Sequence, residues 1–489
     1  MAVVIESSVW EPNPGVYIFI FLASLFSIIV FPYASSSGSS SSSGKAPSLF
    51  DHGISPTASS LRFQRNFLLI YSLASVMEGV WSVFGEFELA YYGLSREQMM
   101  FSLCVGFAAS LIVGSFLGVL SDLIGPKKVC ILFCILHLFL GLWKRITDHP
   151  SILVARICLS LTASIFSFSF ETWMVVQHEE QGHRQDMLSE TFWLMSFFEA
   201  ASLIGSQVLS NWLIGDNLEK NMASHSITAV FLAILGLVCL LRGWTQTPQK
   251  VALKEYRASF SAYIFGGVSF SYEVEVYSYC CDFVRLPDKR IWLLAWAQAC
   301  LHFSIAVFWI LWAPTIVADG REVHLGLIYP CFLGSRMLGS TVFPWLNSGL
   351  SSLRTEDCLV YAFIMLGLVL SITAYDYQKF KLLNADMQEI GVLVTLFCIF
   401  HAGLGVVLPS LARLRTMYVP NALRGGMISL SQAPANAAIL LFLVQGKYYH
   451  NIGNSTIVAF AALGLFTAAG CMHVLKRWGK QPYHNWHKL

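Results

Sequence analysis

Long apolar runs separated by short polar segments dominate the hydrophobic pattern of this chain. The runs are continuous rather than alternating, and many reach the about 20 residues that a helix needs to cross a bilayer. Transmembrane barrels have alternating strands, and only helices and closed barrels satisfy every backbone polar group in lipid. The pattern therefore predicts an all-α membrane protein, with helices near residues 15–33, 66–91, 99–120, 129–142, 151–176, 188–213, 227–241, 291–315, 325–346, 359–374, 390–411, 426–444 and 456–474.

Composition supports a membrane protein. Of the 489 residues 55% are hydrophobic and 12% are charged, whereas a soluble domain carries roughly 25% charged residues. The mean hydropathy is +0.60. The net charge of +2 by itself says nothing about partners. The 12 cysteines are scattered, most of them in apolar runs, where we expect them to pack as small apolar residues.

The order of apolar and polar segments predicts five regions. Residues 1–34 form an extra N-terminal transmembrane helix, because no Lys or Arg precedes the first apolar run as it would in a signal peptide. Residues 35–60 are a Ser/Gly-rich linker. Two six-helix halves follow at 61–242 and 291–489, the second with the C-terminal tail, and a basic cytoplasmic loop at 243–290 separates them. Parallel halves of this kind are a recurrent transporter architecture.

The distribution of basic residues predicts the orientation in the membrane. If residues 45–65 lie in the cytoplasm, most Lys and Arg residues fall on the cytoplasmic side, as the positive-inside rule requires. The C-terminal tail with Lys476 and Arg477 then lies in the cytoplasm, and the N-terminus lies outside.

A signature loop follows the second helix of the first half. The sequence Gly118-Val-Leu-Ser-Asp122-Leu-Ile-Gly125-Pro-Lys127-Lys128 resembles the signature loop of the major facilitator superfamily. Gly118 allows close helix packing, and Gly125 allows a tight turn. Asp122 can face the positive end of a helix that starts inside, such as the one near Gly426. We expect Gly118, Asp122, Gly125 and Lys127 to form a cytoplasmic latch, although Pro126 stands where the family usually has Arg.

Several shorter stretches resemble the molybdate-anion transporter family of this superfamily. They are Leu61–Gln64, Phe170–Trp173, Gln298–Ala299, Leu311–Pro314 and Gly405–Ser410, the last followed by Arg413 and Arg415. The resemblance covers most of the chain from Leu61 to about Gly470, and it implies the major facilitator fold and uptake of molybdate, a tetrahedral oxyanion. His302 and His401 stand where that family usually has Glu, so a divergent member with another substrate is an alternative.

Ionisable residues at membrane depth are candidates for the transport site, because a charge at the bilayer centre costs at least about 2.5–3.5 kcal/mol. Glu78 and His302 lie at similar depth in the first helix of each half, and they are candidates for substrate or proton handling. Arg336 could bind an oxyanion through its guanidinium fork, or it could pair with Glu199 or Glu78. For Glu78 and His302, structural hydrogen bonding is the alternative.

Further polar residues complete the candidate site. We expect Glu171 to act in a gate by pairing with Lys127 or Arg413. Arg156 could bind substrate, or its side chain could reach the membrane interface. His401 could bind substrate or be a satisfied core residue, and the remaining candidates for substrate binding are Gln298, Gln432 and Asn436.

The sequence lacks the motifs of other functional classes. It has no phosphate-binding loop, His-Glu-x-x-His zinc pattern or nucleic-acid module. We therefore expect neither an enzyme nor a metal or cofactor site. The prediction is a monomeric secondary active transporter of a small anion, with the plasma membrane favoured over internal membranes and proton coupling as a hypothesis. Alternatives are a transporter of a sugar-like or other organic solute, and a non-transporting receptor or scaffold.

Overall fold

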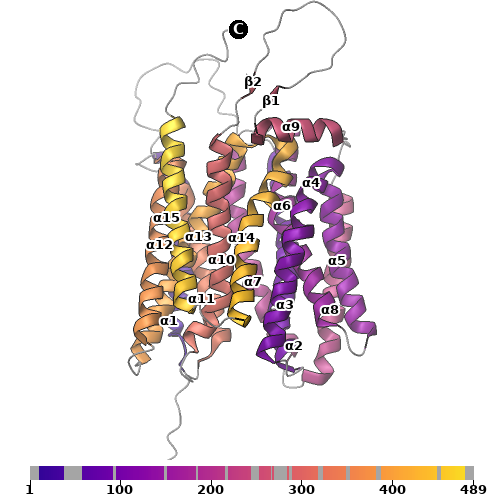
Figure 1. The fold of residues 1–489 in the computed structure, drawn as a ribbon, viewed down its shortest axis with the longest axis vertical. Coiled ribbons are helices and arrows are strands. Elements are labelled where there is room, and N and C mark those ends of the chain that lie inside the picture. The colour runs from indigo at the N-terminus through magenta and orange to yellow at the C-terminus, as the bar shows by residue number, and fades with distance from the viewer. Residues whose placement is uncertain are drawn as a thin grey trace, which may run out of the picture.

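The computed structural model is a helical bundle with most helices roughly parallel to one axis (Figure 1). It describes residues 10–37, 58–91, 95–147, 151–182, 185–214, 218–243, 253–265, 267–268, 284–285, 289–317, 323–348, 353–380, 387–448 and 453–479. The linker predicted at 35–60 lies largely outside these residues.

The described part of the first half is built from six helical elements. The second of them is built from three consecutive segments, α3 (Arg96–Ala109), the π-helical turn η1 (Ser110–Gly114) and α4 (Ser115–Ile124). The others are α2 (Ala58–Tyr91), α5 (Pro126–Ile146), α6 (Ile152–Glu180), α7 (Gln185–Ile214) and α8 (Leu218–Gly243).

The second half repeats this organisation. Its elements are α10 (Lys289–Ile316), α11 (Leu325–Ser348), α12 (Thr355–Phe380), α13 (Met387–Tyr418), the short 3-10 helix η3 (Asn421–Leu423), α14 (Arg424–Tyr448) and α15 (Asn454–Gly479). The segment between the halves was predicted as a loop, but it contains the helix α9 (Leu253–Phe265) and a two-residue antiparallel pair, β1 (Gly267–Val268) with β2 (Val284–Arg285).

Ten helical segments among the described residues are long and apolar enough to span a membrane. Neither α2, which carries Glu78, nor α11, which carries Arg336, is among the ten. Both helices pack within the same bundle. Many large apolar side chains are exposed, including Phe116 and Trp212, as expected of a surface that faces lipid. The predicted fold class, an all-α membrane protein, is therefore confirmed.

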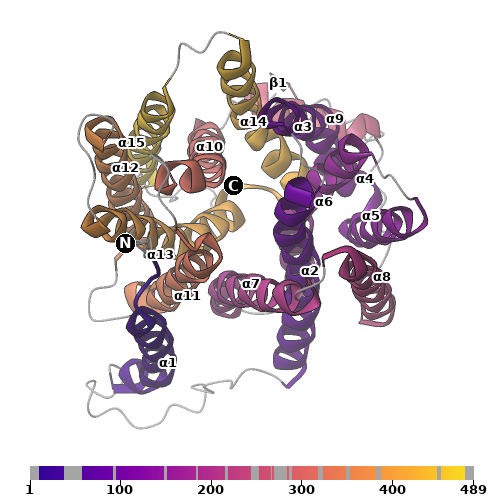
Figure 2. The ribbon, with the colours of Figure 1, turned by 90° about the horizontal axis from the view of Figure 1, so that it is seen from below.

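Two sets of helix contacts join the halves. α14 packs against α3 and α4, whereas α7 packs against α11 and α13 (Figure 2). Small residues permit close packing within the second half, where a Cβ added to Gly339 would lie 1.9 Å from the carbonyl oxygen of Ala402. These contacts hold together the helices that carry Asp122, Glu199 and Arg336.

The extra helix α1 (Pro14–Ser37) packs against α11. Tyr17 donates a hydrogen bond to the carbonyl oxygen of Leu327 (2.5 Å), and Trp345 donates one from Nε1 to Ser27 Oγ (3.0 Å). Before α1, the backbone of Trp10 pairs with the segment at Val323. The N-terminal end of α1 therefore lies beside the connection between α10 and α11.

Candidate functional site

The signature loop closes one end of the bundle, which we call the Asp122 end. Gly125 has a φ of +95°, and Pro126 begins α5 directly after it, so the chain turns sharply between α4 and α5. The Asp122 carboxylate accepts hydrogen bonds from the backbone N–H groups of Gly425 (2.8 Å) and Gly426 (2.7 Å). Asp122 of the first half is thus bound to the N-terminal end of α14 in the second half.

Close helix packing accompanies this contact. A Cβ on Gly118 would lie 2.3 Å from the carbonyl oxygen of Gly425 and 2.0 Å from Ser429 Oγ, so any side chain there would separate α4 from α14. Ser429 donates a hydrogen bond to the carbonyl oxygen of Ser115 (2.9 Å). The small residues therefore allow the two halves to touch along their backbones.

The helix α9 adds a third contact to Asp122. Tyr256 is buried and donates its hydroxyl hydrogen to Asp122 Oδ2 (3.0 Å). Burial and the negative charge of Asp122 raise the pKa of Tyr256 above its ordinary value, so the hydroxyl remains a hydrogen-bond donor. This role of Tyr256 could not be predicted from the sequence, because Tyr256 lies outside the apolar runs.

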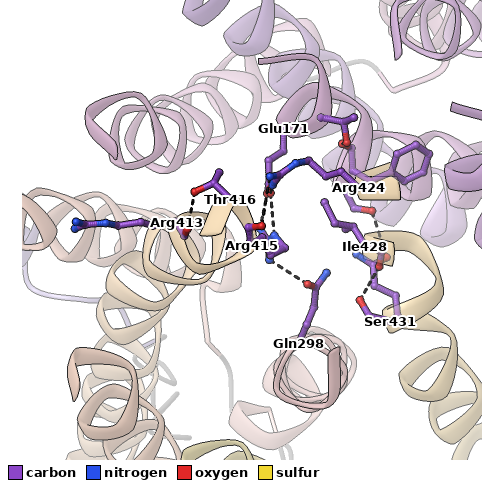
Figure 3. A network of polar contacts seen from close by, with 12 residues as sticks. Glu171, Gln298, Arg413, Arg415, Thr416, Arg424, Ile428 and Ser431 are labelled. Carbon is purple, nitrogen blue, oxygen red and sulfur yellow. Dashed lines mark hydrogen bonds and ion pairs between the residues drawn. The ribbon is translucent and has the colours of Figure 1, made fainter. Parts of the chain in front are cut away.

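A group of polar and charged residues, the Arg415 network, lies near the Asp122 end. It consists of Glu171, Gln298, Arg415 and Arg424 (Figure 3). Arg415 donates two hydrogen bonds to the Glu171 carboxylate, from Nε to Oε1 (2.8 Å) and from Nη2 to Oε2. Its Nη1 donates to Gln298 Oε1 (3.0 Å). Arg424 Nη1 lies 3.5 Å from Glu171 Oε1.

The predicted pairing of Glu171 with Arg413 is wrong. Arg413 and Arg415 are two residues apart on α13, so their side chains leave opposite sides of the helix. Figure 3 shows Arg413 directed away from Glu171. Lys127, the other expected partner, begins α5 with a half-buried side chain. Gln298, expected at a substrate site, instead belongs to the Arg415 network.

Further from the Asp122 end, an ion pair joins the halves. Arg336 Nη2 of α11 lies 2.9 Å from Glu199 Oε1 of α7, and Tyr71 of α2 donates a hydrogen bond to Glu199 Oε2 (2.7 Å). The side chains of Arg336 and Glu199 are 13% and 19% exposed, so both are partly accessible. The ion pair named as an alternative for Arg336 is present in this state of the protein.

Glu78 and His302 have different partners. Glu78 Oε1 lies 3.2 Å from His137 Nε2 of α5, whereas His302 Nε2 lies 3.2 Å from Asn436 Oδ1 of α14. Each contact stays within one half of the bundle. His137 is a new candidate, which the sequence did not single out because it lies in a strongly apolar run.

The remaining candidates occupy separate places. His401 is 1% exposed and lies among the rings of Phe308, Trp309, Phe332 and Phe400, with no hydrogen-bond partner for either ring nitrogen among the described residues. Gln432 accepts a hydrogen bond from Ser167 of the other half (3.2 Å). Arg156 is half-buried on α6 beside Gly106. Within the described residues no group of three or more His, Cys, Asp or Glu side chains could hold a metal ion.

Two six-helix halves, ion pairs in the membrane interior and a hydrogen-bonded closure at one end define a transporter of the major facilitator fold. The chain belongs to the major facilitator family described as "Sugar-transporters, 12 TM", whose model matches residues 51–399. It is an integral, multi-pass membrane protein.

Individual relatives and solved structures share low sequence identity with this chain. The chain is 24% identical to the molybdate-anion transporter of Takifugu rubripes, over 85% of this chain and 87% of that protein. It is also 24% identical to the molybdate-anion transporter of Xenopus tropicalis, over 78% of each chain. A bacterial homologue of the iron transporter ferroportin, in an outward-facing state, has a TM-score of 0.59 at 16% identity, covering 85% of this chain and all of that one. The human organic anion transporter MFSD10 has a TM-score of 0.61 at 11% identity, covering 84% and 99%.

Proposed function

We propose that the protein is a secondary active transporter of a small oxyanion, with molybdate as the first candidate substrate. The observation that carries this proposal is Arg336, a partly exposed guanidinium in the membrane interior that bridges the two halves through Glu199. The relatives named molybdate-anion transporters support the choice of substrate. An intramembrane ionisable residue is by default a candidate functional group.

The chemistry of Arg336 suits an oxyanion. A guanidinium presents several N–H donors in a planar fork and stays charged at physiological pH. A tetrahedral oxyanion offers acceptor oxygens at matching spacing, and it can compete with the Glu199 carboxylate for Arg336. Tyr71, which donates to Glu199, would then hold the released carboxylate in place.

The transport cycle would alternate access at the two ends of the bundle. In the present state Asp122 and the Arg415 network join the halves at the Asp122 end. We place this end in the cytoplasm together with the C-terminus, in agreement with the positive-inside rule. The protein would work as a monomer in the plasma membrane, and Glu78 is the first candidate for proton coupling.

A labelled-substrate panel tests the proposal. Purified protein in proteoliposomes should take up labelled molybdate, and Arg336→Ala should reduce uptake by at least about tenfold, since losing a charged hydrogen-bond partner costs roughly 1.5–3 kcal/mol. Arg145→Ala is the matched control, because Arg145 is exposed at the end of α5. Normal molybdate uptake by Arg336→Ala would contradict the proposal.

The family description favours a second candidate, a sugar. Labelled hexoses and small organic anions therefore belong in the same panel. Uptake of a hexose without uptake of any oxyanion would replace the first candidate with the second. If the purified protein moved no solute in the panel, the receptor or scaffold alternative would gain support.

A further inference from the structure

The charges of the Arg415 network are divided unequally between the halves. Glu171 belongs to α6 of the first half, whereas Arg415 and Arg424 belong to α13 and α14 of the second. The side chains are nearly inaccessible, with Arg424 0% exposed and the other two 10%. One buried carboxylate of the first half therefore contacts two buried guanidiniums of the second, and Asp122 and Glu179 of the first half add negative charge near Arg424.

The donors of the two arginines exceed what Glu171 can accept. Arg415 donates from Nε and Nη2 to the two carboxylate oxygens of Glu171. Arg424 Nη1 makes a 3.5 Å ion contact with Glu171 and has no hydrogen-bond partner in the described part of the chain. Arg424 Nη2 is fixed by the carbonyl oxygen of Arg415 (3.3 Å) and by Asn421 (3.1 Å). Arg424 is thus held by contacts that do not involve Glu171, whereas the Arg415 guanidinium has Gln298 as its other partner.

A small pocket reaches Arg415 from within the second half. Its walls are largely apolar, and its polar side chains are Gln298, Arg415 and Ser431. Gln298 lies on α10 and Ser431 on α14, so neither moves with Glu171. In Figure 3 Gln298 and Glu171 lie on different sides of Arg415. Arg415 therefore separates the pocket from the carboxylate.

Opening of the Asp122 end must separate these charges. Glu171 would leave with the first half, and both arginines would stay in the second half without a counter-ion. An unpaired charge is costly in a poorly solvated place, and two adjacent like charges increase that cost. An anion bound at the same position would remove it.

We propose that Arg415 and Arg424, together with Gln298, form a second oxyanion-binding site, in which the transported anion replaces Glu171 when the Asp122 end opens. This inference rests on the proposed transport of an oxyanion. In the closed state the Glu171 carboxylate occupies the positions of two oxygens of that anion. Glu171 is then an internal competitor, and the anion favours the open state because it binds the arginines only after Glu171 has left.

Equilibrium binding of molybdate to the purified full-length protein tests this site. All variants carry Arg336→Ala, so that the first proposed site contributes nothing. In that background Glu171→Gln should increase the affinity for molybdate by about tenfold or more, because the competing carboxylate is gone. Further addition of Arg415→Gln should abolish binding. Glu180→Gln is the matched control, an exposed acid on the same helix that should leave the affinity unchanged.

A charge exchange keeps the test decisive if Glu171→Gln does not fold. The double variant Glu171→Arg with Arg415→Glu restores an ion pair across the interface but takes one arginine out of the second half. It should unfold at the temperature of its parent and bind molybdate at least about tenfold more weakly, because one charged donor is lost. Unchanged or weaker binding by folded Glu171→Gln, or parental binding by the exchanged protein, would overturn the inference.

Measuring molybdate uptake distinguishes a failure of the second oxyanion site from a failure of the proposed transport function. If the wild-type protein takes up molybdate into proteoliposomes but these binding results are negative, only the second site is wrong. If the wild-type protein takes up no oxyanion, the proposed function fails, and this inference fails with it.

Discussion

Glu78 shows how a membrane-embedded acid can be predicted without its partner. Its place in an apolar run identified it as a candidate, and in the structure it lies 3.2 Å from His137 rather than near His302. A Glu–His contact joins two side chains that can each bind and release a proton. Glu78 is also 19% exposed, so water can reach the carboxylate.

We predict that Glu78→Gln flattens the response of uptake to an imposed pH gradient. The amide preserves the shape and can still hydrogen-bond His137, but it cannot take up or release a proton. Transport into proteoliposomes with and without an inward proton gradient measures the effect. Glu97→Gln is the control, because Glu97 is exposed in the first turn of α3. A gradient response equal to that of the wild type would exclude Glu78 as the coupling residue.

Partners could be predicted from the sequence only in part: Glu199 was an expected alternative for Arg336, whereas Arg415 was not expected for Glu171. Arg336, Glu171 and His302 were recognised because each interrupts an apolar run, whereas their contacts depend on helix rotation, which the run does not reveal. Arg424 was missed because it comes just before the apolar run that begins near Gly426, where a basic residue is typical of a cytoplasmic loop. Only the structure shows that its side chain is completely buried.

At the scale of the helices, the contact between α4 and α14 depends on the absence of a side chain at Gly118. We predict that Gly118→Val disfavours closure of the Asp122 end, because the added atoms meet the carbonyl oxygen of Gly425. Overpacking costs about 1–3 kcal/mol, which shifts a two-state equilibrium roughly 5–150-fold. Labelling of a cysteine introduced beside Asp122 should become faster.

Gly470→Val provides the control for this substitution. Gly470 lies on α15 with no neighbouring atom within 4 Å of an added Cβ. Its substitution should leave the labelling rate unchanged. Equal labelling rates for Gly118→Val and the wild type would mean that the contact between α4 and α14 does not hold the Asp122 end closed.

The docking of α1 makes a separate prediction. Ser27 accepts a hydrogen bond from Trp345 (3.0 Å) and donates one to the carbonyl oxygen of Thr341 (3.3 Å). Ser27→Ala should lower the free energy of unfolding by about 1–2 kcal/mol, as expected for two hydrogen bonds between helices. Thermal unfolding in detergent measures this loss.

Ser371→Ala is the control, because the hydroxyl of Ser371 donates to the carbonyl oxygen of Gly367 within its own helix. If the two variants unfolded at the same temperature, α1 would contribute nothing through Ser27. The apolar run predicted α1 as an extra helix, but its side chains gave no indication of which core helix it would contact.

For the whole molecule, the sequence predicted far more of the fold than of the site. Apolar runs of membrane-spanning length fix where helices occur, and the signature loop identifies the superfamily, so fold class and family followed from local patterns. The helix α9 escaped prediction because polar residues interrupt it and it is too short to form an apolar run of membrane-spanning length, although Tyr256 contacts the latch. The domain boundaries remain predictions.

The most direct test of alternating access is to lock the Asp122 end. Glu179 of α6 and Asn421 of η3 hydrogen-bond across the halves, so cysteines at both positions can be joined by a short crosslinker. Wild-type protein treated with the same reagent controls for the native cysteines. We predict that crosslinking abolishes molybdate uptake and that cleavage of the crosslink restores it. Uptake at the uncrosslinked rate in fully crosslinked protein would show that the halves need not separate there, and would contradict the account.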